Sequence, residues 1–218
     1  MAIDKILNVL FDQGIRMERE RALIFGTSGD DNIRSVEEHF TVRGLTGADR
    51  ITVQADNQTV YGGGGDDNIE QGYGRWDGRL VAHGDSGNDQ ISAGAGADVL
   101  YGGTGNDTIV GGNGGDVIVG GAGDDLLYPN RDRQGGARQD NAADTIQYGP
   151  GTAHGNDTIV GLNVAEGDRL AISREWRIDA VEDAKGYLVT LSGDEAVCTI
   201  RLEDVTGGIS GSGWYTLF

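Results

Sequence analysis

The chain has 218 residues, of which 39 are glycine and only 2 are proline, so it is neither collagen-like nor a proline-rich linker. Hydrophobic residues make up 37%, which predicts a smaller core than an ordinary globular domain of this length contains. Acidic residues outnumber basic residues by 35 to 17, and the net charge of −18 argues against nucleic acid or anionic membranes as partners and favours cations.

The sequence lacks the usual signatures of an enzyme or a membrane protein. Cys198 is the only cysteine, so an internal disulfide or a multi-cysteine zinc site cannot form. His39, His83 and His154 are far apart, and neither H-E-x-x-H nor G-x-S-x-G occurs. No stretch approaches the roughly 20 apolar residues of a transmembrane helix. We therefore expect no enzyme; a pair of catalytic carboxylates is the one arrangement that the many acidic residues leave open.

Residues 1–25 form the first predicted unit, an N-terminal helical cap. The apolar residues between positions 3 and 11 recur at helical spacing, and Gly14 would end the helix. The segment lacks the cleavage site of a secretory signal. Because its polar face is not basic, we expect the helix to cover the first unit of the repeats that follow rather than to bind a membrane.

Repeats of nine residues occupy the second unit, residues 26–128. Five contiguous copies between residues 84 and 128 open with GDSGND, AGAGAD, GGTGND, GGNGGD and GGAGDD. Three more, GTSGDD, GLTGAD and GGGGDD, begin 18 residues apart at positions 26, 44 and 62. Position six is Asp in all eight copies, and position eight is a large aliphatic residue.

The residues at position eight predict a thin core that extends through the whole repeat region. They are Ile33, Val42, Ile51, Val60, Ile69, Leu80, Ile91, Leu100, Ile109, Ile118 and Leu127. Their spacing is 9 residues except on either side of Leu80, where it is 11, and we attribute this to two insertions, near residues 71–78 and at Ala82–His83. Each repeat would supply one strand and one turn, with position eight inward and its neighbours outward. Two repeats then complete one coil of two parallel sheets.

This pattern resembles the RTX (repeats-in-toxin) family of calcium-binding proteins, whose repeat is G-G-x-G-x-D-x-U-x. The resemblance covers nearly half of the chain. It implies an all-β fold, a right-handed parallel β-roll, with Ca²⁺ as its ligand. It further implies export by the type I secretion machinery, an extracellular location and folding that depends on calcium.

Stacked turns would bind Ca²⁺ because their carboxylates and carbonyl groups supply oxygen ligands, which a hard and flexible ion prefers. Turns at residues 26, 44, 62, 84, 102 and 120 share one edge, and Asp30, Asp66 and Asp124 would add charge there. The candidate ligands on this edge are Asp31, Asp49, Asp67, Asp89, Asp107 and Asp125, with the glycines Gly26, Gly29, Gly44, Gly47, Gly62, Gly65, Gly84, Gly87, Gly102, Gly105, Gly120 and Gly123.

The other edge would carry only Asp98 and Asp116, since its turns at 35–40 and 53–58 lack the glycines. Five gaps on the first edge and one on the second predict about six Ca²⁺ ions. A single Gly/Asp turn would indicate no more than a tight turn. Eight of them in register indicate a series of ion sites.

The third unit, residues 129–218, is predicted to be a β-rich capping and secretion-signal region. Asp144, Asp157 and Asp168 either form one or two irregular Ca²⁺ sites or lie in turns before strands. Residues 186–192 and 197–202 read as a hairpin, in which Cys198 would be a small buried hydrophobe.

The outward positions of one sheet form an apolar stripe. Its members are Tyr61, Val81, Val99, Tyr101, Val117 and Val119. Exposed apolar patches usually mark a contact. We expect residues 142–218 to fold back onto the stripe; otherwise a second subunit, a partner domain or a polysaccharide would cover it.

The leading interpretation of function is a non-catalytic calcium-binding module that is loose in the cytosol and folds in extracellular Ca²⁺. One alternative is the C-terminal module of a larger secreted enzyme such as a protease, lipase or polysaccharide epimerase. Another is a carbohydrate-binding module in which arginines contact an acidic polymer. The arginines considered for that role are Arg34, Arg50, Arg75 and Arg79.

Overall fold

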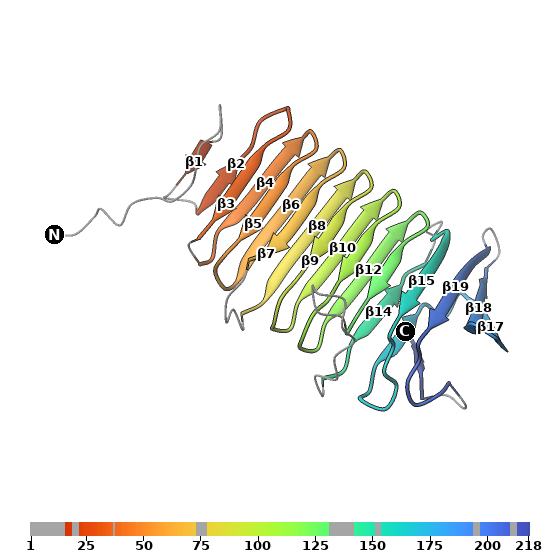
Figure 1. Ribbon diagram of the computed structural model, residues 1–218. Helices are drawn as coiled ribbons and strands as arrows, with labels where there is room; N and C mark the ends of the chain where they lie inside the picture. The colour runs from red at the N-terminus through yellow and green to blue at the C-terminus, as the bar shows by residue number, and fades with distance from the viewer. Residues whose placement is uncertain are drawn as a thin grey trace.

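The chain folds as a β-roll in a computed structural model that describes residues 16–18, 22–36, 38–72, 78–130, 142–150, 154–193, 197–209 and 213–218. These residues contain twenty strands and no helix. The helix expected between residues 3 and 11 lies outside the described residues. From β2 to β17, successive strands alternate between two sheets of ten strands each, as Figure 1 shows. The predicted right-handed roll of parallel strands is the architecture of this chain.

Sheet A holds the even-numbered strands of the repeats. Its order is β1 (Arg16–Glu18), β2 (Leu23–Phe25), β4 (Thr41–Thr46), β6 (Gln58–Gly64), β8 (Leu80–Ser86), β10 (Val99–Thr104), β12 (Val117–Ala122), β14 (Thr145–Tyr148), β16 (Arg169–Ile172) and β20 (Tyr215–Leu217). All of its neighbouring strands pair in parallel except β1 and β2.

Sheet B faces sheet A across the core. Its order is β3 (Asn32–Ser35), β5 (Arg50–Val53), β7 (Asn68–Gln71), β9 (Gln90–Ser92), β11 (Thr108–Val110), β13 (Leu126–Tyr128), β15 (Asn156–Val160), β19 (Val197–Glu203), β18 (Gly186–Ser192) and β17 (Arg177–Asp183). Its strands are parallel up to β19, and β19, β18 and β17 then pair antiparallel. The hairpin expected between residues 186 and 202 is present as β18 and β19.

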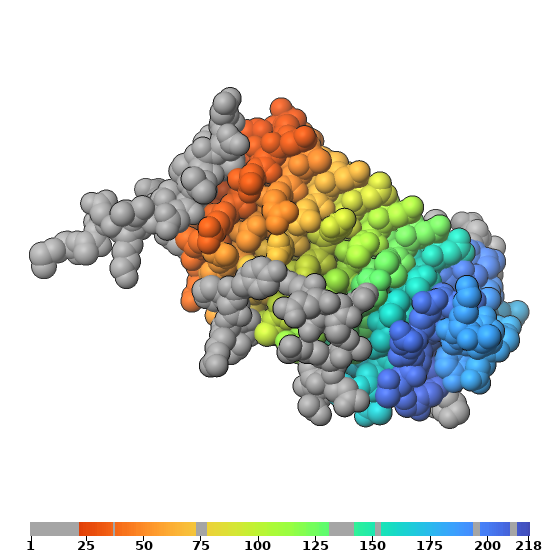
Figure 2. Space-filling view, in the orientation of Figure 1, coloured from red at the N-terminus to blue at the C-terminus, as the bar shows by residue number. Residues whose placement is uncertain are grey.

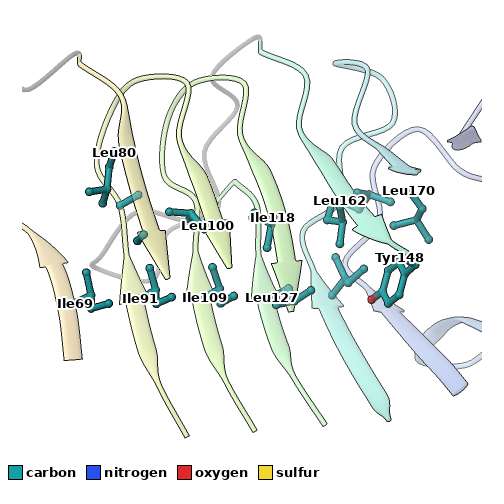
Figure 3. Close-up of a cluster of buried hydrophobic side chains, with 14 of the residues drawn as sticks. Ile69, Leu80, Ile91, Leu100, Ile109, Ile118, Leu127, Tyr148, Leu162 and Leu170 are labelled. Atoms are coloured by element: carbon teal, nitrogen blue, oxygen red, sulfur yellow. The ribbon is translucent and has the colours of Figure 1, made fainter. Parts of the chain in front are cut away.

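The core consists of two facing rows of aliphatic side chains, one from each sheet. All eleven residues predicted to be inward are at most 1% exposed. Figure 3 shows Leu100 and Ile118 from sheet A pointing toward Ile91, Ile109 and Leu127 from sheet B. Strand register explains this burial, because Ile91, Ile109 and Leu127 are directly paired across their strands. Each sheet contributes only a single row of side chains to the core. Hydrophobic burial therefore contributes less to folding stability than in a domain with a thicker core.

The extra residues of the repeat region lie in one place, and the expectation of two separate insertions is wrong. Ala82, not Leu80, pairs with Val60 on one side and Leu100 on the other. The spacing from Ala82 to Ile91 is therefore the regular 9 residues, and the whole insertion precedes Leu80. A loop can absorb extra residues, whereas a one-residue slip inside β8 would turn its core side chains outward.

Residues 142–218 continue the two sheets, and the expectation that they fold back onto the apolar stripe is wrong. β14, β16 and β20 extend sheet A, while β15 and β19 extend sheet B. Figure 2 shows these segments, cyan to blue, as further bands that follow the coils of the repeats. Pairing in this way satisfies the backbone groups at the end of the repeats, which an exposed sheet edge would leave unpaired.

Candidate calcium-binding turns

The position-six aspartates of one edge form a continuous column, here called the long aspartate ladder. Its members are Asp31, Asp49, Asp67, Asp89, Asp107, Asp125 and Asp157. In each step the backbone N–H of one aspartate donates to Oδ1 of the next, with N···O distances between 2.8 and 3.0 Å. The six aspartates assigned to this edge by their spacing do stack, and Asp157 joins them at the C-terminal end.

A short aspartate ladder lies on the opposite edge. It consists of Asp98, Asp116, Asp144 and Asp168, joined by the same N–H to Oδ1 bonds of 2.8 to 2.9 Å. Sequence analysis placed Asp98 and Asp116 here but left the role of Asp144 and Asp168 open. Before Asp98, buried Phe40, Gln58 and Leu80 occupy the equivalent position, and the Leu80 N–H donates to Asp98 Oδ1 at 2.7 Å.

The second carboxylate oxygen of the interior aspartates is the most notable feature of these turns. Oδ2 is buried and has no hydrogen-bond partner in Asp49, Asp67, Asp89, Asp98, Asp107 and Asp125. An ionised carboxylate buried in this way is unfavourable unless a cation compensates it. Desolvation accordingly raises the pKa of Asp67, Asp98, Asp107 and Asp125 to about 7 and that of Asp89 to about 6.

The glycine at position one of the long-ladder turns leaves space beside this oxygen, whereas the turn of Asp98 has Ala93 at position one. A Cβ added at Gly44 would collide with Oδ2 of Asp49 and with the carbonyl oxygen of Gly62 in the next coil. The same pair of groups surrounds Gly26, Gly62, Gly84 and Gly102 on the long-ladder edge. On the other edge, Gly111 lies beside Asp116 Oδ2 and the Pro129 carbonyl. Oxygens of two successive coils thus face one small space, which fits the needs of a hard cation.

The glycine at position four permits the close stacking of the turns. Gly47, Gly65, Gly87, Gly105 and Gly123 have φ between 118° and 133°, a region that side chains disfavour. A Cβ at Gly65 would collide with the carbonyl group of Gly47 in the preceding coil. Gly29 belongs to the first turn of this edge, and an added Cβ there would meet nothing within 4 Å.

A second ladder at position five lies outside the long aspartate ladder, and sequence analysis missed it. Each side-chain oxygen accepts the N–H of the position-five residue in the next coil, at 2.7 to 2.9 Å. The acceptors are Asp30, Asp66, Asn88, Asn106 and Asp124. These bonds run opposite in direction to those of the aspartate ladders and need no ion. The recurrence of Asp or Asn at position five was the available signal, and it is broken only at Ala48.

The remaining candidate residues are spread over the surface or buried. Arg34 donates to Gln54 Oε1 and Arg50 pairs with Glu70 at 3.2 Å, both on the outer face of sheet B, while Arg75 lies outside the described residues. Cys198 is buried in β19, and burial raises the pKa of its thiol to about 12, which suits a core residue. Where the structure describes the chain, no three His, Cys, Asp or Glu side chains form a metal cluster. Ion ligands here would therefore include many backbone carbonyls.

The apolar stripe lies on the outer face of sheet A and contains an aromatic column. His83 stacks between Tyr61 and Tyr101 with ring centroids 4.7 and 4.6 Å apart, and the Arg43 guanidinium lies 4.7 Å from the centre of the Tyr61 ring. Tyr101 is 36% exposed. A polysaccharide or partner domain on this face stays a prediction.

Comparison with known proteins identifies the repeats. A family model described as "RTX calcium-binding nonapeptide repeat (4 copies)" matches residues 41–70, 83–118 and 101–132. Residues 41–70 and 83–132 therefore carry RTX calcium-binding nonapeptide repeats, and in the structure these repeats form a β-roll.

The other comparisons concern whole chains. No curated protein sequence matches this chain. Among solved structures it is similar to the crystal structure of the extracellular lipase LipA from Serratia marcescens, at 17% identity and a TM-score of 0.38. The match covers 89% of this chain and only 40% of the lipase. Within the described residues, no helix has the length and apolar character needed to cross a membrane.

Proposed function

We propose that this chain is a non-catalytic module that folds when several Ca²⁺ ions bind after export from the cell. The supporting observation is the row of buried Oδ2 atoms without hydrogen-bond partners on the long-ladder edge, each beside a position-one glycine and, at every such turn but that of Asp125, beside a carbonyl oxygen of the next coil. Transport by the type I secretion machinery and an extracellular location belong to this proposal.

Charge explains why folding would wait for calcium. The chain carries a net charge of −18, and folding places its aspartates in register along two edges. At cytosolic calcium levels this repulsion and the desolvation of the carboxylates oppose compaction. Outside the cell, ion binding compensates both effects, so the binding free energy becomes folding free energy.

The geometry supports about six ions in the regular turns. The long-ladder edge has Oδ2 of one coil and a carbonyl oxygen of the next around five glycines, from Gly26 to Gly102, and the other edge has such a pair at Gly111. The position-six aspartates and the glycine carbonyls of these turns are the proposed ligands. Asp144 and Asp157, which extend the two ladders, are candidates for further sites.

A calcium titration of the metal-stripped protein tests this function. Far-UV circular dichroism would report folding, and calorimetry would report the number of ions. We expect a cooperative gain of β-structure at sub-millimolar to millimolar Ca²⁺ with about six ions bound, and no comparable effect of Mg²⁺. A protein that is fully folded without metal and binds one ion or none would contradict the proposal.

A further inference from the structure

A turn outside the nonapeptide repeats contains buried oxygen atoms that the fold leaves without donors. The turn connects β15 to β16 and ends with the sequence NVAEGD at residues 163–168. It keeps the final aspartate of a repeat turn, since Asp168 is the last member of the short aspartate ladder. At its first and fourth positions it has Asn163 and Glu166, where a repeat has glycine.

Asp168 brings two asparagine residues together at this turn. Its Oδ2 atom accepts a hydrogen bond from the backbone N–H of Asn163 at 2.7 Å and another from the side-chain Nδ2 of Asn130 at 2.5 Å. Its Oδ1 atom accepts from the Asp144 N–H. Asp168 is buried, and its role in this arrangement is to position the asparagines around one carboxylate.

Three acceptor oxygens at this turn have no hydrogen-bond partner: Asn130 Oδ1, Asn163 Oδ1 and Glu166 Oε2. Asn130 is 4% exposed and Asn163 is 5% exposed. Buried polar groups in folded proteins are nearly always paired, so three unpaired acceptors here indicate a missing partner.

The chemistry of these atoms points to a hard cation. Two amide oxygens and one carboxylate oxygen form an oxygen-only set without sulfur or imidazole, and such a set selects Ca²⁺ over softer metals. The set differs from the repeat turns, where the carboxylate of position six combines with backbone carbonyls. Here side chains at other positions supply the oxygens.

We propose that Asn130, Asn163 and Glu166 form an additional Ca²⁺ site at the junction between the repeats and the C-terminal strands. The proposal builds on the proposed function only in taking Ca²⁺ as the available cation. Asn130 lies two residues after the end of β13, whereas Asn163 forms a parallel bridge with Thr206, after β19. An ion bound here joins the last regular coil to the segment that leads to β20. It makes docking of the C-terminal strands dependent on calcium.

Full-length variants test the site by ion counting. N163A removes the side-chain oxygen but keeps the backbone N–H that Asp168 accepts, and E166Q removes the charge at nearly constant size. We expect calorimetry to find one ion fewer in N163A/E166Q than in the wild type. N163D keeps a side-chain oxygen at position 163 and adds a negative charge, so it should retain the full number of ions. D107N serves as a control that weakens a repeat site while leaving this one intact.

Hydrogen exchange of residues 161–168 and 204–206 provides a second measurement. Calcium should protect these amides in the wild type and in N163D, and this protection should be lost in N163A/E166Q. If N163A/E166Q binds as many ions as the wild type with unchanged affinity, the site does not exist. If instead the proposed function fails and this site exists, the wild type binds only one ion, and N163A/E166Q binds none. The two failures therefore give different ion counts.

Discussion

The turns on the two edges of the roll stack in the same register but carry different side chains at position six. On the long-ladder edge every coil from Asp31 to Asp157 places a carboxylate at position six. On the other edge, the first three coils have Phe40, Gln58 and Leu80 there, and carboxylates begin only at Asp98. Both edges keep the same parallel register. The backbone geometry therefore does not require aspartate, and the carboxylates indicate a requirement for ions.

Position one shows the same difference. Ser35, Val53 and Gln71 are at most 1% exposed and fill the space that glycine leaves open on the long-ladder edge. Side chains thus fill one edge of the first coils, whereas on the other edge the position-one glycines leave space beside the unpaired Oδ2 atoms of Asp49 and Asp67. Under the proposed function, these coils combine one turn that binds calcium with one that does not. The contrast leads to four predictions, in order of decreasing effect.

The largest change in stability should follow a change in pH, because pH titrates the buried aspartates of the two ladders. Desolvation raises the pKa of Asp67, Asp107 and Asp125 from 3.8 to about 7, so the metal-free folded state binds more protons than the unfolded state. Stability without calcium is then greatest below about pH 4 and declines as pH rises toward about 7. Urea unfolding of the metal-free protein at pH 5 and pH 8 measures this.

Calcium affinity should increase as pH rises, whereas the stability of the metal-free protein decreases. Protons compete with Ca²⁺ for the same carboxylates, so binding should tighten between about pH 5 and pH 8. A metal-free protein that is equally stable at both pH values, or more stable at pH 8, would contradict this assignment.

Substitutions at position six should separate the two edges. L80A removes a fully buried side chain, and we expect a loss of about 2–5 kcal/mol that is the same with and without calcium. D107N should lower stability only in calcium, because it weakens an ion site but relieves a buried charge in the metal-free protein. Urea midpoints of both variants, measured over a series of Ca²⁺ concentrations at which the roll is folded, test the contrast. Equal calcium dependence in L80A and D107N would disprove it.

Adjacent glycines provide a matched pair for the stacking of the long-ladder edge. G65A forces a side chain into φ 118° and against the Gly47 carbonyl group, so we expect a loss of about 2–3 kcal/mol. At Gly64 an added Cβ meets only ordinary contacts, with Ser86 Oγ at 3.5 Å and Thr46 Cγ2 at 3.7 Å. G64A should therefore change the thermal midpoint little, and a similar loss in both variants would rule out this explanation.

The smallest effect should come from the position-five ladder. A48N supplies the missing acceptor for the Asp66 N–H and should stabilise the protein by about 1 kcal/mol. N106A, which removes the acceptor for the Asp124 N–H at 2.9 Å, should destabilise it by a similar amount. Both effects should persist in chelator wherever the roll remains folded, since these bonds involve no ion. A higher urea midpoint in A48N together with a lower one in N106A would support the ladder. Midpoints that move in the same direction in both variants would contradict it.

The sequence alone determined the regular part of this protein. Because the repeat is local, the spacing of 9 residues was enough to place Ile109 in the core and Asp107 on an edge. Coils of 18 residues likewise assigned Asp31 and Asp98 to opposite edges. The strand-like sequence of residues 197–202 also predicted that Cys198 would be buried in a strand, as it is.

Only the tertiary structure decided the irregular parts, because insertions break the local spacing that prediction depends on. Strand pairing put Ala82 in the core row and Leu80 at the position of an aspartate. It also brought Asp157 into the long ladder across an insertion that hides its register in the sequence. The side-chain Nδ2 of Asn130 and the backbone N–H of Asn163 both donate to the Asp168 carboxylate, a contact between distant segments that no local pattern encodes.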